Sequence, residues 1–298
     1  MGRKGAILVS GLSLLLFLFL GSRAAASQAE DPWKPVAEAL GRSGEEQDGV
    51  YRVTFPRSDL RIRVAGANIR PALALTSWCA FQRAGGGTMV MGDLVLQTPE
   101  VSPVVSKLAE VGIEITAIHN HLTGEAPRVT YLHFHGHGDA RRLATVLREV
   151  LVLTGTPLAT PRPRAGEEPT LDAERLGRIL GYRGVARGGV LAFSIPRAER
   201  ITRGGATLSP RMGVATVINF QTEGSGAVTT GDFVLLAGEV QAVIRALRQY
   251  GLEVTALHNH MLDEQPRLFF LHFWGRGSIE QLARGLRAAL DQTRHTAP

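Results

Sequence analysis

The sequence repeats itself over most of its length. Residues 92–138 align without a gap on residues 231–277, and 23 of these 47 positions are identical. Upstream, the match continues after a slip of one residue, so that Arg57 aligns on Arg197. Each copy has the size of a domain, which excludes a solenoid of short units. We therefore expect two tandem homologous domains.

The boundaries follow from composition. We place the first repeat domain at residues 31–153 and the second at residues 171–293. Residues 154–170, with the sequence TGTPLATPRPRAGEEPT, are rich in proline and charge and are expected to form a linker. A chain of 298 residues allows each domain to bury a core of its own.

Both copies carry the same order of secondary-structure signals. An entry helix and short strands are expected at residues 31–40, 50–55, 60–64, 72–81 and 88–96 of the first copy, and at residues 171–180 and 190–195 of the second. Three consecutive glycines at residues 85–87 are expected to turn the last hairpin.

The second half of each copy predicts a β-α-β-β-α tail. In the first copy, a helix with apolar residues at every third or fourth position is expected to end at Gly112, with Gly251 as its counterpart. Strands at residues 113–121 and 128–137 follow, and Asp139 is expected to cap a last helix. The pattern predicts an α+β domain with helices on one face of a mostly antiparallel sheet.

The chain begins with a pattern typical of a secretory signal peptide. A basic head precedes the apolar run of residues 6–20, and Ala24 and Ala26 form an A-x-A cleavage site before Ser27. An uncleaved anchor is the lesser interpretation, because a bilayer span needs roughly 20 apolar residues. We expect residues 1–26 to be removed and the protein to be exported, either periplasmic or secreted, with no membrane span left.

Charge and cysteine content restrict the partners. The formal net charge is +6, and three of the positive residues lie within residues 1–26. The sequence has no cluster of lysine and arginine interleaved with aromatic residues, which argues against a nucleic-acid partner. Cys79 is the only cysteine, so no disulfide can form within the chain. A small ligand or a component of the cell envelope is the expected partner.

The best-matched stretch holds the residues that carry chemistry. HNHLTGEAPRVTYLHFHGHG at residues 119–138 aligns on HNHMLDEQPRLFFLHFWGRG at residues 258–277. Alternation along a strand places His119 and His121 on one face and Asn120 on the other. With a carboxylate from the following turn, two such imidazoles form a ligand set that suits Zn, Fe, Mn or Cu. The candidate metal ligands are His119, His121, Glu125, His133, His258, His260, Glu264 and His272.

The neighbouring polar residues are candidates for binding a small or anionic ligand. They are Asn120, Arg128, Asn259 and Arg267. The two arginines would orient such a ligand or pair with the glutamates.

A simple hairpin does not bring His133 to the first two histidines. With Pro127 opposite His121, His133 would lie opposite Ile115, about 13 Å along the strand from His119. With Arg128 opposite His121, the side chain of His133 would face the other side of the sheet. His133 would then join only if the loop of residues 122–127 folds back, or if it meets residues of the opposite repeat.

Two weaker signals lie near this stretch. Gly-Asp pairs at Asp93 and Asp232 could hold a carboxylate near the site, although a turn is the commoner reason for such a pair. His133, His135 and His137 could bind a metal in the first copy alone, since the second copy replaces the last two with Trp and Arg.

The motifs GD(F/L)VL, G(I/L)E(I/V)TA(I/L)HNH, E-x-PR and HF occur in both copies, and together they resemble the LppY/LpqO family of bacterial exported proteins. The resemblance covers nearly all of the chain after residue 26. It implies export and a duplicated architecture but no chemistry, because the family is described as a domain of unknown function. Lipoprotein members carry a cysteine at the cleavage site, which is missing here.

We therefore predict an exported protein with a divalent transition metal or a small ligand at an HxHxxxE site in each repeat. Whether it is an enzyme stays open. The alternative is a non-catalytic binding or interaction protein of the cell envelope, whose histidines are structural and brace the two repeats. A nuclease of the HNH class is excluded, because its three residues are dispersed through a hairpin-helix motif and here they are contiguous.

Overall fold

A computed structural model describes residues 1–2, 31–159 and 171–297. The expected signal peptide, beyond its first two residues, and most of the expected linker lie outside the described residues. Both repeats belong to one compact unit, Trp33–Pro298. Among the described helices, none combines the length and the apolar character that crossing a membrane requires.

The first repeat contains four helices and nine strands among its described residues. They are α1 (Lys34–Leu40), β1 (Glu45–Gln47), β2 (Val50–Pro56), β3 (Ile62–Val64), β4 (Ala67–Ile69), α2 (Pro71–Ala74), β5 (Thr76–Ala84), β6 (Gly87–Gln97), α3 (Thr98–Glu110), β7 (Glu114–His119), β8 (Glu125–Ala126), β9 (Val129–Gly138) and α4 (Ala140–Val152).

The second repeat follows the same order, with a 3-10 turn in place of α2. Its elements are α5 (Ala173–Leu180), β10 (Val185–Arg187), β11 (Val190–Pro196), β12 (Thr202–Arg203), β13 (Ala206–Thr207), η1 (Pro210–Met212), β14 (Ala215–Glu223), β15 (Gly226–Leu235), α6 (Val240–Gln249), β16 (Glu253–His258), β17 (Phe269–Gly277) and α7 (Ile279–Leu290).

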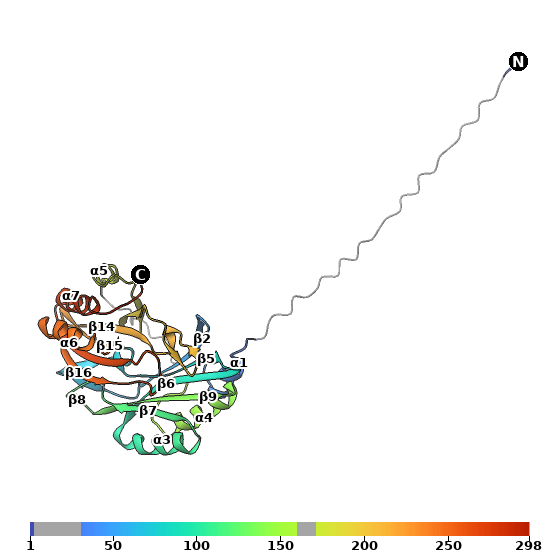
Figure 1. Cartoon of the computed structure of the whole chain (residues 1–298), viewed down its shortest axis with the longest axis horizontal. Helices are drawn as coiled ribbons and strands as arrows, with labels where there is room; N and C mark the ends of the chain where they lie inside the picture. Colours follow the sequence, from blue (N-terminus) through green and yellow to red (C-terminus); the bar gives the residue numbers. More distant parts are fainter. Residues whose placement is uncertain (3–30, 160–170, 298) are drawn as a thin grey trace. The chain divides into compact units, whose positions relative to one another are not determined.

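Each repeat builds one six-stranded antiparallel sheet. The strand order is β1-β2-β5-β6-β9-β7 in the first repeat and β10-β11-β14-β15-β17-β16 in the second. One face of each sheet packs against the helices of its own repeat, in cores that include Phe134 with Leu147 and Phe273 with Leu286. The helices of the two repeats lie on different sides of the molecule (Figure 1). The predicted α+β class, with helices on one face of an antiparallel sheet, is confirmed.

Local signals behave as expected at several element ends. Gly112 and Gly251 follow α3 and α6 with φ of 74° and 80°, a conformation that glycine adopts without strain. The Asp139 side chain accepts a hydrogen bond from Arg142 N at the start of α4. Residues 72–75, in contrast, do not continue β5: α2 occupies most of this stretch, because the segment before β5 leaves the sheet to pack on the other repeat.

The faces of the two sheets that lack helices are joined by exchanged segments. Residues of β3, β4 and α2 of the first repeat pack with Val228 and Trp274 of the second. In return, residues 201–214 of the second repeat pack with Ala80, Met89 and Met91 of the first. Each repeat thus covers apolar surface of the other, and buried clusters lie between the repeats as well as within each of them.

Two equivalent glutamines reinforce this exchange. Gln82 of β5 donates to Thr207 O and accepts from Ser209 N of the second repeat. Gln221 of β14 accepts from Arg70 N and donates to Asn68 O of the first. The contacts are reciprocal, as expected for two copies related by an approximate twofold axis.

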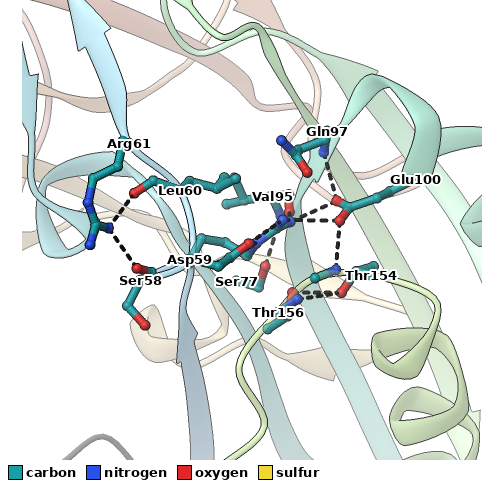
Figure 2. Close-up of polar contacts among 12 residues, drawn as sticks. Ser58, Asp59, Leu60, Arg61, Ser77, Val95, Gln97, Glu100, Thr154 and Thr156 are labelled. Carbon is teal, nitrogen blue, oxygen red and sulfur yellow. Dashed lines mark hydrogen bonds and ion pairs between the residues drawn. The ribbon is translucent and has the colours of Figure 1, made fainter.

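A buried arginine ties together the elements of each repeat. Figure 2 labels Asp59, Val95 and Glu100, which belong to this network in the first repeat. The side chain of Arg57, fully buried, donates to Val95 O, to Asp59 and to Glu100 at the start of α3. Glu100 also accepts from Gly155 N, so the first residues of the expected linker pack against the first repeat. Arg197 makes the same contacts in the second repeat, with Val234 O and Glu239. The recurring pairs Pro56-Arg57 and Pro196-Arg197 therefore mark the same structural clamp in both repeats.

Candidate metal centre

Six histidines, three from each repeat, meet in one cluster between the two sheets. His119 and His258 end the edge strands β7 and β16, His121 and His260 follow two residues later, and His133 and His272 lie on the neighbouring strands β9 and β17. Rings from different repeats stack in pairs, with centroid separations of 3.5 Å for His119–His258, 3.8 Å for His121–His272 and 3.7 Å for His133–His260. The two half-sites suggested by the duplication thus form a single site.

The strand register explains how His133 reaches the cluster. A bulge between Ile115 and Ala117 shifts the pairing of β7 with β9, so that Ala117 lies opposite His133. The rings of His119 and His133 are consequently 5.0 Å apart. The register with Pro127 opposite His121 is wrong, and the register with Arg128 opposite His121 holds only for Glu114 and Ile115, before the bulge. Both assumed a direct hairpin, whereas part of the connecting loop forms β8 and pairs with β3.

Two aspartates join the histidines. Asp93 lies opposite His133 in the pairing of β6 with β9, and Asp232 lies opposite His272 in the equivalent pairing of β15 with β17. The Asp93 Oδ2 atom is 3.7 Å from His121 Nε2, and the Asp232 Oδ2 atom is 3.4 Å from His260 Nε2. The sequence favoured a turn for these Gly-Asp pairs; both aspartates are instead in the interior of a strand.

The glycine before each aspartate allows the site to form. His272 Nδ1 is 2.9 Å from Gly231 O, and His133 makes the equivalent bond to the backbone of Gly92. With Nδ1–H donated to a carbonyl, the lone pair of each ring lies on Nε2. In His133 this atom is 4.0 Å from Asp93 Oδ1, whereas in His272 the Nδ1 atom is the one near Asp232, 3.9 Å from its Oδ1. A Cβ at position 231 would overlap Val217 O, and one at position 92 would overlap the Phe134 ring, so only glycine fits.

The polar atoms that face one another in this cluster have no hydrogen-bond partner. They are Nε2 of His119, His121, His133, His258, His260 and His272, Nδ1 of His119, and Oδ1 of Asp93 and Asp232. A buried polar atom without a partner costs about 1–3 kcal/mol, so a purely structural network with so many of them is unfavourable. A shared metal ion satisfies several such lone pairs at once.

These atoms fall into groups of the size a metal ion needs. In each group the ligand atoms lie within 4.8 Å of one another. The groups are Asp93 with His121 and His133; Asp232 with His260 and His272; His119 with His121 and His272; and His119 with His133, His258 and His260.

Burial keeps the imidazoles neutral. Desolvation lowers the pKa of every histidine in the cluster, to about 4 for His258 and to about 3 for His272. Mutual repulsion of the rings lowers the pKa of His119 further. Burial raises the pKa of both aspartates, an effect that the Arg52 guanidinium opposes at Asp93 and that Asp93 reinforces at Asp232. Neutral imidazoles with free lone pairs are the form that binds metals.

The cluster lies near the surface but is largely enclosed. His133, His260 and His272 are between 2% and 7% exposed. His119, His121 and His258 are half-buried at the rim. A groove of about 610 Å³ lies elsewhere, along α5 and the start of α7, and includes Arg175 and Arg276.

The two glutamates predicted as ligands lie outside these groups of described residues. Glu264 is fully buried, and its carboxylate accepts from Leu268 N at 2.8 Å and faces Arg267 at 3.4 Å. Glu125 lies in β8, opposite Val64. In the second repeat this glutamate therefore organises the loop. Its pairing with Arg267 corresponds to the expectation that the arginines pair with the glutamates. Arg128 is exposed.

The asparagines of the two HNH motifs connect the repeats. Asn120 Nδ2 donates to Thr255 O, and Asn259 Nδ2 donates to Thr116 O. The hydroxyl groups of the same threonines donate to His121 O and His260 O. Alternation correctly placed the asparagines away from the histidine face, and their role is to hold each motif against the other repeat.

The other histidines of β9 are engaged separately. His135 Nδ1 is 3.4 Å from Glu114 Oε2, and Glu114 also pairs with Arg203 of the second repeat. His137 Nε2 bonds Ala84 O at 2.9 Å. His135 and His137 thus do not join His133 in a ligand group of the described residues.

Comparison with known proteins identifies the family and leaves its activity open. The family model described as Domain of Unknown Function (DUF1259) matches residues 34–152 and again residues 174–292. The chain belongs to this family. It consists of two tandem copies of the domain, as the internal alignment predicted.

No curated protein matched the sequence. A solved structure titled as a trimeric bacterial microcompartment shell protein PduB is similar to this chain at 13% identity, with a TM-score of 0.23 and coverage of 84% of this chain and 89% of the other.

Proposed function

We propose that this protein binds divalent transition-metal ions in a centre shared by its two repeats, and that the metal stabilises their association. The observation that carries the proposal is the convergence of six unpaired Nε2 atoms and two aspartate side chains, all largely buried. Ligands from both repeats bind more tightly when the repeats are docked, so the binding free energy adds to the stability of the docked form.

The donor set supports a metal of the Mn-to-Zn series. Imidazole suits Zn, Cu, Fe and Ni, whereas Ca and Mg prefer sites made of oxygen atoms. Cys79 supplies no ligand, because it lies in the helix-side core of the first repeat, where burial raises the pKa of its thiol to about 12. Two histidines with one aspartate form the ligand pattern of non-haem iron sites, and the same pattern also binds Mn and Zn.

The cluster is enclosed, which favours binding of a metal ion over catalysis on a large substrate. Three of the six histidines are at least 93% buried, and all six lie where the sheets of the two repeats meet. The alternative is that the histidines brace the repeats without metal, as their interface position by itself suggests. The many unpaired ring nitrogens favour the metal.

Location is part of the proposal. The basic head, the apolar run of residues 6–20 and the A-x-A site support export. The motifs around HNH support a finer kinship with the LppY/LpqO exported proteins. In that setting the metal-bound protein would serve the cell envelope as a binding component.

Elemental analysis of the full chain, purified without a histidine tag, tests the proposal. We expect metal at stoichiometric level, and a chelator should lower the Tm because it removes ligand-linked stability. His260→Ala should lose metal and no longer respond to the chelator, whereas His137→Ala, outside the cluster, should behave as wild type.

If the histidines brace the repeats without metal, the expected results are different. Wild type would hold less than about 0.1 metal per chain, unchanged after addition of Zn, Cu, Mn or Fe, and His119→Ala would lower the Tm equally with and without chelator. That pair of results would overturn the metal proposal.

A further inference from the structure

We propose that the centre holds two metal ions, one in each repeat, and that the ion beside Asp232 is bound more tightly than the ion beside Asp93. This inference rests on the proposed function and specifies its stoichiometry and order of filling.

The ligand groups support two ions. Asp93 groups with His121 and His133 of its own repeat, and Asp232 groups with His260 and His272 of the other. No group among the described residues contains both aspartates, and the two remaining groups consist of histidines from both repeats. Two ions, each with one carboxylate, therefore match the groups better than one ion that binds both carboxylates. A metal ion beside each aspartate compensates the burial of its carboxylate charge, so each aspartate with its two histidines provides a place for an ion of its own.

The second repeat has the closer geometry. Ligand atoms around a tetrahedral ion with bonds near 2.1 Å stand about 3.4 Å apart. The Oδ2 atom of Asp232 and Nε2 of His260 are 3.4 Å apart, whereas the equivalent atoms of Asp93 and His121 are 3.7 Å apart. Binding in the first repeat therefore requires a larger contraction of the ligands.

The first repeat also places a positive charge behind its aspartate. Trp78 lies directly opposite Asp93 in the sheet, and the Arg52 guanidinium stacks on the Trp78 ring at 3.8 Å. In the second repeat Val217 lies opposite Asp232, and the position equivalent to Arg52 is Ala192. The Arg52 guanidinium, held on the Trp78 ring next to Asp93, repels a cation bound at that carboxylate, and the second repeat has no such charge at the equivalent position.

Repulsion between the ions separates the two sites further. Two divalent ions with two aspartates leave a net positive charge in a largely buried cluster, so the first ion disfavours the second. The side of Asp232, with closer ligands and no arginine behind it, fills first.

Titration of the metal-free, untagged full chain with Co²⁺ tests this, because the visible spectrum reports each coordination site as it fills. We expect two ions per chain in two steps, with the second about tenfold weaker or more. Asp232→Asn should abolish the tight step and retain one weak ion; Asp93→Asn should retain the tight step alone.

A single ion in wild type would overturn the two-ion inference and leave the proposed function standing, whereas no ion would defeat both. Loss of all binding in each aspartate variant, with the fold retained by circular dichroism, would also overturn it, because one ion would then depend on both carboxylates. If Asp93→Asn loses the tight step and Asp232→Asn keeps it, the order of filling is the reverse of the proposed one and the asymmetry is contradicted.

Arg52→Gln tests the charge argument directly. We expect the weak step to tighten about tenfold and the tight step to stay unchanged. Arg63→Gln, a change at an exposed arginine of the same repeat that donates to Gly66 O, is the matched control and should alter neither step. An unchanged weak step in folded Arg52→Gln would contradict the role of this charge. Because Arg52 also donates to Arg211 O, the aspartate variants decide the proposal if Arg52→Gln fails to fold.

Discussion

A residue of the cluster could be predicted from the sequence where a pattern in its own strand marked it, and less well where its contacts lie far away in the chain. His119 and His121 follow from alternation on one strand and from their recurrence in the second copy. Asp93 and Asp232 had the same recurrence, but a Gly-Asp pair is also typical of turns. Their contact with the histidines crosses from β6 to β9, about 40 residues later in the chain, which no local pattern reveals.

Glu264 shows, at the same scale, that a recurring residue can also have a structural contact. Its recurrence in both copies and its spacing from the HNH motif predicted a ligand. The structure gives its carboxylate to Leu268 N and Arg267, so the glutamate organises the loop instead. Recurrence within a chain marks a constrained position, and the constraint can be structural.

Substitution of Gly231 by alanine tests the glycine requirement. A Cβ there would overlap Val217 O, and overpacking of this kind destabilises proteins by about 1–3 kcal/mol. We expect chemical denaturation to show this loss, and metal content to fall because Gly231 O positions His272. Gly238→Ala, where a Cβ meets nothing within 4 Å, is the control. Equal stability of the two variants would contradict the account.

At the scale of elements, most helices and strands followed from periodicity, and the exceptions have a common cause. Residues 72–74 belong to α2 rather than to a strand, and β7 carries a bulge. Both lie where one repeat contacts the other. Their conformation depends on a surface that is distant in sequence, which local propensity does not describe.

The arginine clamp, also at this scale, predicts a pH dependence of stability. Burial alone would raise the pKa of Glu100, but hydrogen bonds from Arg57, Gly155 and Gln97 outweigh it and hold the pKa below its ordinary value of 4.5. A carboxyl with a lowered folded-state pKa stabilises the fold above the unfolded pKa and loses this effect as the pH falls through the folded pKa. Stability should therefore decrease below about pH 4.5.

Thermal unfolding between neutral and acid pH checks this expectation. Glu100→Gln should lower the free energy of unfolding at neutral pH by about 1–3 kcal/mol, since Arg57 keeps only part of its partners, and should show a shallower loss toward acid. Glu110→Gln, an exposed position at the other end of α3, should match wild type. An identical acid profile for wild type and Glu100→Gln would refute the assignment.

At the scale of the whole molecule, the two repeats depend on each other. Segments of each repeat cover the sheet of the other, and Gln82 and Gln221 bond across the boundary. A sequence that predicts two domains therefore folds as one compact unit, and the cluster is a property of both repeats together.

Cleavage of the chain between the two repeats should leave the repeats associated. We expect a chain with a protease site introduced into residues 160–170 to stay associated after cutting, with both fragments in one peak on size exclusion, because the exchanged segments bury apolar surface on both sides. The uncut chain with the same insertion is the control. Separation of the fragments without denaturant would show that the exchange contributes little stability.

The sequence by itself determined the duplication, the α+β class and the recurrence of the histidine motifs, because these depend on patterns repeated along the chain. Only the tertiary structure brings the histidines of both repeats into one cluster, places Asp93 and Asp232 beside them, and sets Arg52 on the side of Asp93 alone. The physical reason is distance: these relations join residues that are far apart in sequence and become neighbours only when one repeat packs on the other.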